Sequence, residues 1–221
     1  MINHILSCYD KDLVKIRHSI VKMGLLVEEI IKLSAEVFKN KESTLADQAK
    51  AIDVKVNKLD NEVEVLAIEV IALRSPKAHD LRETIAALKI AVILERMGDL
   101  AKNIARKVVA INYKIDKNIQ DEIQLMIGVI ITMQQRVIEA YETENLEMLS
   151  LIIQDEQQVD DLYKKLRISI EDKISINPAQ TSDLIVILFA LKNFERIADY
   201  ITKVAYIFKY VVTGESKNYE H

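Results

Sequence analysis

The sequence predicts an all-α protein, in which six helices form one elongated bundle made of two tandem three-helix repeats. Hydrophobic residues recur at steps of three and four along nearly all of the 221 residues, which is the period of an α-helix. Only four glycines and two prolines occur, so the chain has little material for hairpin turns. Half of the residues are hydrophobic and 29% are charged, which is typical of a globular protein.

Five polar or proline-containing stretches separate the six predicted helices. They are NKES at 40–43, RSPKAHD at 74–80, NYKIDKN at 112–118, ETEN at 142–145 and SINPAQTSD at 175–183. Ser43 is the expected N-cap of the second helix. Ser75 is expected to cap the third helix and Asn177 the sixth, each followed by a proline at the first helical position. Gly214 is expected to end the last helix.

The second half of the chain repeats the first half. With a shift of 103 positions, Asp53 matches Glu156 and Phe38 matches Tyr141. With a shift of 100, LERMGDLAKNIA at 94–105 matches FERIADYITKVA at 194–205. The three-residue difference falls in the proline-containing connections, where loops tolerate changes of length. The sequence therefore predicts two repeats, 1–114 and 115–221.

Charge and apolar runs exclude several classes of protein. The formal net charge is −4 and the two signs are interspersed, which argues against a nucleic-acid-binding protein. The single cysteine, Cys8, cannot form an internal disulfide. The N-terminus does not resemble a signal peptide, and runs such as 184–191 fall short of the roughly 20 apolar residues that span a bilayer. We expect a soluble cytoplasmic protein that meets a membrane only through its partners.

The third predicted helix places two like charges one turn apart, at Glu95 and Asp99. Such a pair destabilises a helix by roughly 0.2–0.5 kcal/mol, so its presence needs an explanation. Glu195 and Asp199 repeat it in the sixth helix, and an arginine again follows the glutamate. All four acids flank the apolar seam of their helix. The two seams contain Ile90, Leu94, Met97, Ala101, Ile104 and Val108, and Ala190, Phe194, Ile197, Ile201, Val204 and Phe208.

The second helix of each repeat supplies further acids. Asp53, Asn57 and Asp60 share one face of the second helix, and Glu156 and Asp160 share one face of the fifth, with Asp155 close by. Carboxylates that converge from two helices are costly unless protons or cations neutralise them. Oxygen ligands suit magnesium, calcium, manganese or iron, and zinc also binds carboxylates. The candidate ligands are Glu95, Asp99, Asp53, Asn57, Asp60, Glu195, Asp199, Glu156 and Asp160.

A metal-free scaffold is the first alternative, because structural ion-pair networks also gather charged groups. Arg96, Lys102 and Arg196 lie near the acids, and Asp199 with Lys203 has the favourable order of a helix ion pair. Lys203 stands where Asn103 stands in the first repeat, so we expect the first site to be the cleaner one.

A helical-bundle metal enzyme or an iron-storage protein is the second alternative. Di-iron sites of helical bundles pair a glutamate with a histidine three residues later. None of the four histidines here has a glutamate at that distance before it. The sequence also shows no nucleophile with its base and no glycine-rich phosphate loop, so we expect a binding protein and not an enzyme.

Taken together, these residues resemble the PhoU family of accessory proteins of phosphate-specific transport. The resemblance rests on ERMGD and ERIAD, the SPKAHDLR entry to the third helix, the acidic second helices and the closing YIFKYVVTGE. It covers the chain from about Leu13 to Glu215. The sequence departs from the family pattern at Asn57, at Tyr163, which matches Asp60, and at Lys203.

The resemblance implies a six-helix, two-repeat bundle, usually a homodimer, that binds multinuclear metal clusters through its acidic motifs. It implies a negative regulator of the phosphate-starvation response, which links PstB, the ATPase of the phosphate ABC transporter, to the sensor histidine kinase PhoR. By position, it assigns the nine candidate ligands above to two metal sites, one in each repeat.

Overall fold

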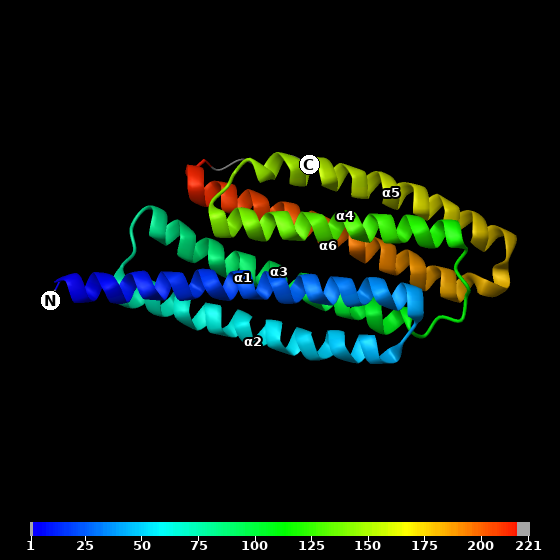
Figure 1. Cartoon of the computed structure of the whole chain (residues 1–221), viewed down its shortest axis with the longest axis horizontal. Helices are drawn as coiled ribbons and strands as arrows, with labels where there is room; N and C mark the ends of the chain where they lie inside the picture. The colour runs from blue at the N-terminus through cyan, green and yellow to red at the C-terminus, as the bar shows by residue number, and fades with distance from the viewer. Residues whose placement is uncertain (1, 216–221) are drawn as a thin grey trace.

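The computed structural model describes residues 2–215 of the chain, and the side chains of residues 11–215 (Figure 1). Six long helices occur in this part of the chain, and none of its residues is in a strand. The all-α, six-helix prediction is confirmed. The helices are α1 (Ile2–Asn40), α2 (Ser43–Arg74), α3 (His79–Val108), α4 (Lys117–Thr143), α5 (Met148–Ile176) and α6 (Thr181–Thr213), with the short 3₁₀ helix η1 (Pro178–Gln180) before α6.

All five breaks overlap the predicted stretches, although the break at 109–116 begins before the predicted 112–118 and the break at 144–147 ends after the predicted 142–145. The caps of α2 and α3 also differ from the prediction. Ser43 is the first residue of α2, and Glu42 occupies the N-cap without a side-chain hydrogen bond. Ser75 does not cap α3. It ends α2 in the left-handed conformation, with φ of 49°, and α3 begins only at His79. The proline at 76 disfavours a helical conformation for the residue before it, which explains why the chain turns there.

The entry to α6 is also more gradual than predicted, while its end is as expected. Pro178 opens η1 rather than α6, and Asn177 before it makes no side-chain capping bond. Gly214 ends α6 with φ of 72°, a conformation that costs glycine nothing because it has no Cβ.

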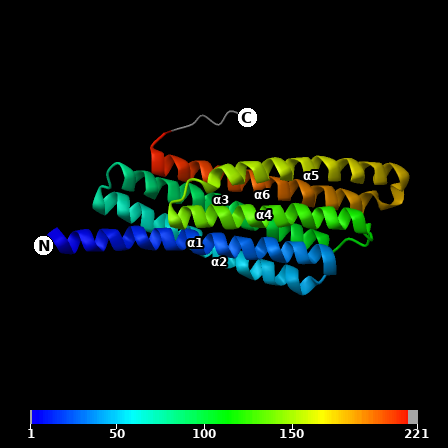
Figure 2. The same ribbon diagram turned by 45° about the horizontal axis from the view of Figure 1, so that its top comes forward.

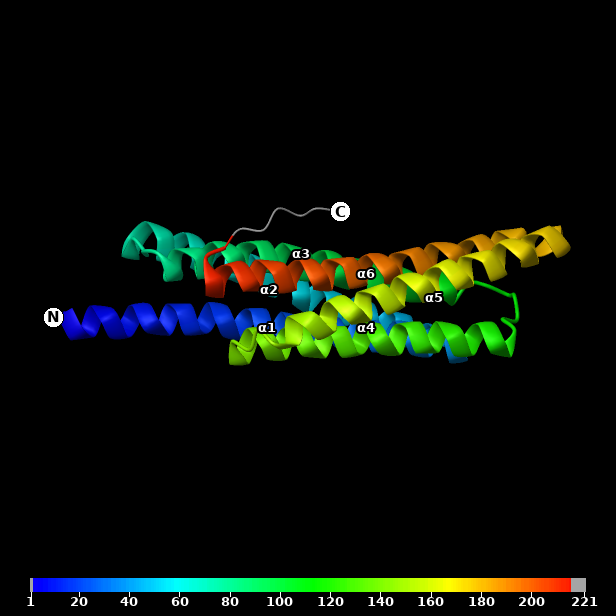
Figure 3. The same ribbon diagram turned by 90° about the horizontal axis from the view of Figure 1, so that it is seen from above.

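The helices pack in two groups of three, α1 to α3 and α4 to α6, and two helices of each group contact the other group. α1, α2 and α3 contact one another, as do α4, α5 and α6, and the two groups meet where α1 packs on α4 and α3 packs on α6. α2 contacts only α1 and α3 among the described elements, whereas α5 contacts only α4, α6 and η1. Figures 1 and 2 accordingly show α2 and α5 on opposite flanks of the molecule, and Figure 3 shows its elongated shape from above. This arrangement agrees with a two-repeat bundle, while the boundary at 114/115 stays a prediction.

The apolar seams form the core of the bundle, as predicted. Every seam residue of α3 and α6 is buried. Phe38 of α1 contacts Phe194 of α6, with ring centroids 6.1 Å apart, and so ties the two groups together. Where α1 meets α4, the amide of Gln134 donates a hydrogen bond to the Gly24 carbonyl oxygen at 3.0 Å.

No single helix in the described range combines the length and the apolar composition needed to cross a bilayer. Only α5 and the segment 178–213, bent by 119° relative to each other, pass that test as a pair.

Candidate metal centre

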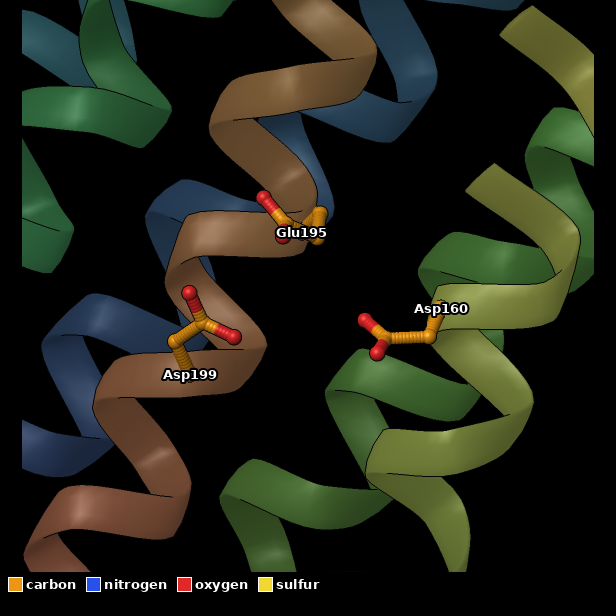
Figure 4. Close-up of side chains that lie close together, drawn as sticks. All are labelled: Asp160, Glu195 and Asp199. Carbon is orange, nitrogen blue, oxygen red and sulfur yellow. The ribbon is translucent and has the colours of Figure 1, made fainter. Parts of the chain in front are cut away.

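Three carboxylates of the second repeat come together between α5 and α6. Oxygen atoms of Asp160, Glu195 and Asp199 lie within 4.8 Å of one another, and the side chains face each other across the two helices (Figure 4). Each acid lies next to the packed stripe of its helix, because Val159 and Phe194, the residues before Asp160 and Glu195, are fully buried. At metal–oxygen distances of about 2.0–2.6 Å, ligands on opposite sides of one ion lie at most about 5 Å apart. The three oxygens therefore have the spacing that one cation needs.

Glu156 belongs to the same acidic group. Burial raises the pKa of Glu156 to about 7, and the charges of Asp199, Asp160 and Glu195 add to the effect. Burial and nearby carboxylates both disfavour the ionised form of this carboxyl, so it stays partly protonated near neutral pH. A bound cation would favour the ionised form.

A lysine borders the cluster of the second repeat. The Nζ atom of Lys192 lies 2.6 Å from the Oε2 atom of Glu195 and 5.3 Å from the ring centroid of Tyr163. Burial raises the pKa of Glu195, and Lys192 opposes this rise. A cation that uses Glu195 would therefore compete with an ammonium group at the edge of the site.

The first repeat differs, because Lys102 lies between its acids. The Nζ atom of Lys102 is 2.8 Å from the Oδ2 atom of Asp53 and 2.7 Å from the Oδ1 atom of Asp99. Asn103 donates a hydrogen bond to the other oxygen of Asp99 at 2.9 Å. Asp53 is only 4% exposed, and its Oδ1 atom is buried without a hydrogen-bond partner among residues 11–215. This orphaned oxygen fits a site that takes a further cation.

The remaining acids of the first repeat surround this ion-paired group. Burial raises the pKa of Glu95, followed by the charges of Asp99, Asp60 and Asp53. Burial also raises the pKa of Asp60. These effects place four of the five predicted residues in one electrostatic group. The fifth, Asn57, is exposed, and its backbone carbonyl accepts a hydrogen bond from Asn61.

Three expectations about neighbouring charges need correction. The first site is not the one with less competition from positive charge, because Lys102 neutralises its acids. The matching residue of the second repeat, 100 positions later, is the uncharged Thr202. The cation of Lys203 lies over the Tyr200 ring, 5.2 Å from the centroid, so its long side chain can follow its own helix instead of reaching into the acids. Asp155 faces α4, where it pairs with Arg136.

Sequence reasoning missed the roles of Lys192 and Thr202, although the repeat contains a signal for both. Lys192 stands where the first repeat has Val92, and Thr202 stands where it has Lys102. The positive charge near the acids therefore occupies different positions of the motif: three residues after Asp99 in the first repeat, and three residues before Glu195 in the second. Comparison of the two motifs position by position shows this exchange.

The donor set of the second repeat fits a hard cation, because Asp160, Glu195 and Asp199, with Glu156 close by, offer oxygen atoms. In the first repeat Lys102 lies between Asp53 and Asp99, and only the second oxygen of Asp53 lacks a partner among residues 11–215. Carboxylate oxygens suit magnesium, calcium, manganese and iron. The ligand assignments themselves stay predictions.

Fold and site together define a class of protein: a six-helix bundle of two repeats, with an acidic cluster between the outer helix and the third helix of each repeat. The family model of the PhoU domain matches residues 20–108 and 123–208. The chain belongs to the PhoU family.

Individual relatives agree with this assignment. The chain is 32% identical over 214 residues to a Zymomonas mobilis protein, covering 97% of this chain and 90% of that protein. It is 28% identical over 208 residues to a Clostridium acetobutylicum protein, covering 94% of this chain and 95% of that protein. Both relatives are named phosphate-specific transport system accessory protein PhoU homolog.

Solved structures show the same fold. The crystal structure of PhoU from Pseudomonas aeruginosa has a TM-score of 0.88 at 25% identity and covers 94% of this chain and 100% of that chain. The structure of the phosphate transport system regulatory protein PhoU from Streptococcus pneumoniae has a TM-score of 0.85 at 24% identity, with 95% and 99% covered, and shows likeness of fold alone.

Proposed function

We propose that the chain is a metal-binding regulatory protein of phosphate uptake and of the phosphate-starvation response. It acts in the cytoplasm without enzymatic activity, as a homodimer, and restrains uptake through the ATPase of the phosphate ABC transporter and a sensor histidine kinase. Its functional units are the repeats 1–114 and 115–221. Membership of the PhoU family and the names of the relatives support the connection with phosphate transport.

The observation that carries the metal-binding part is the meeting of Asp160, Glu195 and Asp199 within 4.8 Å. Three ionised carboxylates at this spacing repel one another, and partial burial strengthens the repulsion. A divalent or trivalent cation turns that repulsion into attraction. A cation bound there would join α5 to α6 in addition to their apolar packing.

Metal content tests this part directly. Protein purified without chelator is analysed for iron, zinc, manganese, magnesium and calcium, and so are the variants Asp160→Asn and Asp161→Asn. We expect Asp160→Asn to lose metal and Asp161→Asn to retain it, because the exposed Asp161 pairs with Lys164 and Gln157 instead. Equal metal content in the two variants contradicts the assignment.

The regulatory part is tested in cells that lack the gene. A reporter of the phosphate-starvation response should be active at high phosphate in these cells, and the wild-type gene should silence it. Co-purification of the tagged chain with the transporter ATPase and the kinase identifies the contacts. An unchanged reporter in the deleted strain contradicts the proposed regulation, whatever the metal content is.

A metal-free scaffold is the second candidate, and Lys102 favours it. Its ammonium group already neutralises Asp53 and Asp99 in the first repeat. The chain is such a metal-free scaffold if it carries no metal and if added Mn²⁺, Zn²⁺ or Ca²⁺ leaves its melting temperature unchanged. Aerobic oxidation of added Fe²⁺, followed optically, would instead indicate the iron enzyme or iron-storage alternative.

A further inference from the structure

Two arginines, one from each repeat, line a single pocket between α3 and α6. The pocket has a volume of about 240 Å³ and is lined by Glu95, Arg96, Asp99, Leu100, Arg196 and Tyr200. Arg96 and Arg196 occupy the same position in the two motifs, directly after the glutamate. The packing of α3 on α6 therefore brings equivalent guanidinium groups to one concavity at the junction of the repeats.

Neither guanidinium has a partner in the described part of the chain. No ion pair or hydrogen bond joins Arg96 or Arg196 to another of its residues. Arg17 pairs with Glu83, Arg136 with Asp155 and Arg167 with Glu171, whereas the exposed Arg106 shares the lack of a partner among the described residues but lies in a different pocket, away from Arg96 and Arg196. Both arginines are exposed, and the carboxylates of Glu95 and Asp99 line the same pocket. Two like charges in one pocket repel each other, and an anion bound between them reduces that repulsion.

The two acids that line the pocket compete little for the arginines. Asp99 accepts hydrogen bonds from Lys102 through one oxygen and from Asn103 through the other. Burial and the negative charges of Asp99, Asp60 and Asp53 raise the pKa of Glu95 and so disfavour the ionised form that an arginine would pair with. On the side of α6, the ammonium group of Lys203 lies over the ring of Tyr200 and adds a third positive charge next to the pocket. Arg96 and Arg196 are therefore available to bind a ligand.

We propose that Arg96 and Arg196 form a binding site for one small oxyanion, of the size of phosphate or sulfate, at the junction of the repeats. Each guanidinium presents parallel N–H donors that match two oxygens of such an anion. The pocket is smaller than the 300–1,000 Å³ or so of drug-sized sites, which favours a small ligand. The bound anion bridges α3 and α6. This proposal needs no metal and does not depend on the proposed function.

Calorimetric titration of the metal-free, full-length chain tests the site. Inorganic phosphate, sulfate and a nucleoside monophosphate are titrated separately, with chelator present and ionic strength held constant with chloride. We expect phosphate and sulfate to saturate one site per chain and to raise the melting temperature, and the larger nucleotide to bind at least about tenfold more weakly because of the pocket volume. Nucleotide binding as tight as that of phosphate overturns the small-ligand assignment.

Single variants locate the site. Arg96→Ala and Arg196→Ala should each weaken phosphate binding by about tenfold or more, because each removes a charge-assisted pair of hydrogen bonds. Arg106→Ala is the matched control, since Arg106 is an exposed arginine of the same helix that lines a different pocket. We expect it to bind as the wild type does. Equal weakening by all three variants would indicate non-specific attraction and would overturn the proposal.

Stability measurements and lysine variants keep the test decisive if an alanine variant folds poorly. Without anion, each alanine variant should melt at the wild-type temperature or above, because one of two repelling charges is gone. Arg96→Lys and Arg196→Lys retain the charge and lose the paired donors, so they should bind phosphate more weakly than the wild type. Binding that appears only after metal is added, or no saturable binding to the metal-free wild type, overturns the proposal.

Discussion

The Nζ atom of Lys102 lies 2.8 Å from the Oδ2 atom of Asp53 and so joins α3 to α2 through a partly buried ion pair. The second repeat has the uncharged Thr202 at the matching position, with its side chain buried beside Glu156. One acidic cluster therefore contains its own cation, whereas the other has its nearest lysine at the edge. We expect this difference to give the two clusters different stability without metal and, if both bind metal as proposed, different affinity for it.

Replacing Lys102 by the residue of the second repeat should separate stability from metal binding. We expect Lys102→Thr to lower the free energy of unfolding of the metal-free protein by about 1.5–3 kcal/mol, because the buried Asp53 loses its charged partner. The same change should increase metal affinity in the first repeat. Thermal unfolding with chelator and calorimetric titration with Mn²⁺ measure the two effects.

Lys89→Thr is the control for Lys102→Thr, because Lys89 is an exposed residue of α3 outside the acidic cluster. It should change neither quantity noticeably. A Lys102→Thr protein that is as stable as the Lys89→Thr protein would show that the contact with Asp53 contributes nothing.

Lys192 should limit the metal affinity of the second repeat. We expect Lys192→Val, which restores the residue of the first repeat, to increase the affinity for Mn²⁺ because the Oε2 atom of Glu195 loses a competing ammonium group at 2.6 Å. The stability of the metal-free protein should change by less than about 1 kcal/mol, since the Lys192 side chain is 48% exposed and solvent screens its charge. Lys203→Asn is the comparison, because Lys203 lies over Tyr200. A larger gain of affinity in Lys203→Asn would contradict the roles inferred for the two lysines.

The metal-free protein should become less stable as the pH rises from 4.5 to 7. Burial and neighbouring carboxylates raise the pKa of Glu156 from 4.5 to about 7, so the folded state binds more protons than the unfolded state between these values. The free energy of unfolding then falls with rising pH. The loss from Glu156 should be on the order of 1–2 kcal/mol, because solvent screens a half-exposed group. The raised pKa values of Glu95 and Glu195 act in the same direction.

Unfolding by urea between pH 4.5 and 8, with chelator, measures this slope. Glu156→Gln should flatten it, whereas Glu171→Gln on the exposed part of the same helix should leave it unchanged. Added metal should reverse the trend, because metal binds the deprotonated carboxylates. Stability of the metal-free protein that rises with pH across this range would refute the cluster as described.

The contact between the repeats should tolerate no side chain at Gly24. A Cβ atom there would lie 2.0 Å from the Cδ1 atom of the buried Ile138 on α4. We expect Gly24→Ala to destabilise the protein by about 1–3 kcal/mol through overpacking. Ile138→Val removes the Cδ1 atom and should restore part of this loss in the double variant. A Gly24→Ala protein as stable as the wild type would mean that α4 adjusts freely.

Gly128→Ala provides the matched control for this contact. Gly128 is also a helical glycine, but a Cβ atom there would meet no described atom within 4 Å. This variant should gain about 0.5–1 kcal/mol, because alanine loses less backbone entropy than glycine in a helix.

Local signals were sufficient for much of the fold and for part of the site. The three- and four-residue hydrophobic steps predicted the seams through Leu94 and Phe194, and both seams are buried. The acids at 195 and 199 follow from the same periodicity, since a residue next to the buried stripe must lie at its edge. Helix caps were less predictable: Ser75 and Asn177 have the right chemistry, but the prolines after them lengthen the connections instead of opening the helices.

The sequence by itself determined that the chain forms six helices in two matching sets, and which face of each helix is apolar, because these properties depend on residues a few positions apart. Tertiary structure alone decided that α2 and α5 lie on the flanks, that Lys102 neutralises Asp53, and that Arg96 and Arg196 share a pocket. Each of these facts depends on contacts between residues that lie far apart along the chain. Only the packing of the helices sets which charges become neighbours, and the electrostatic energy depends on that separation.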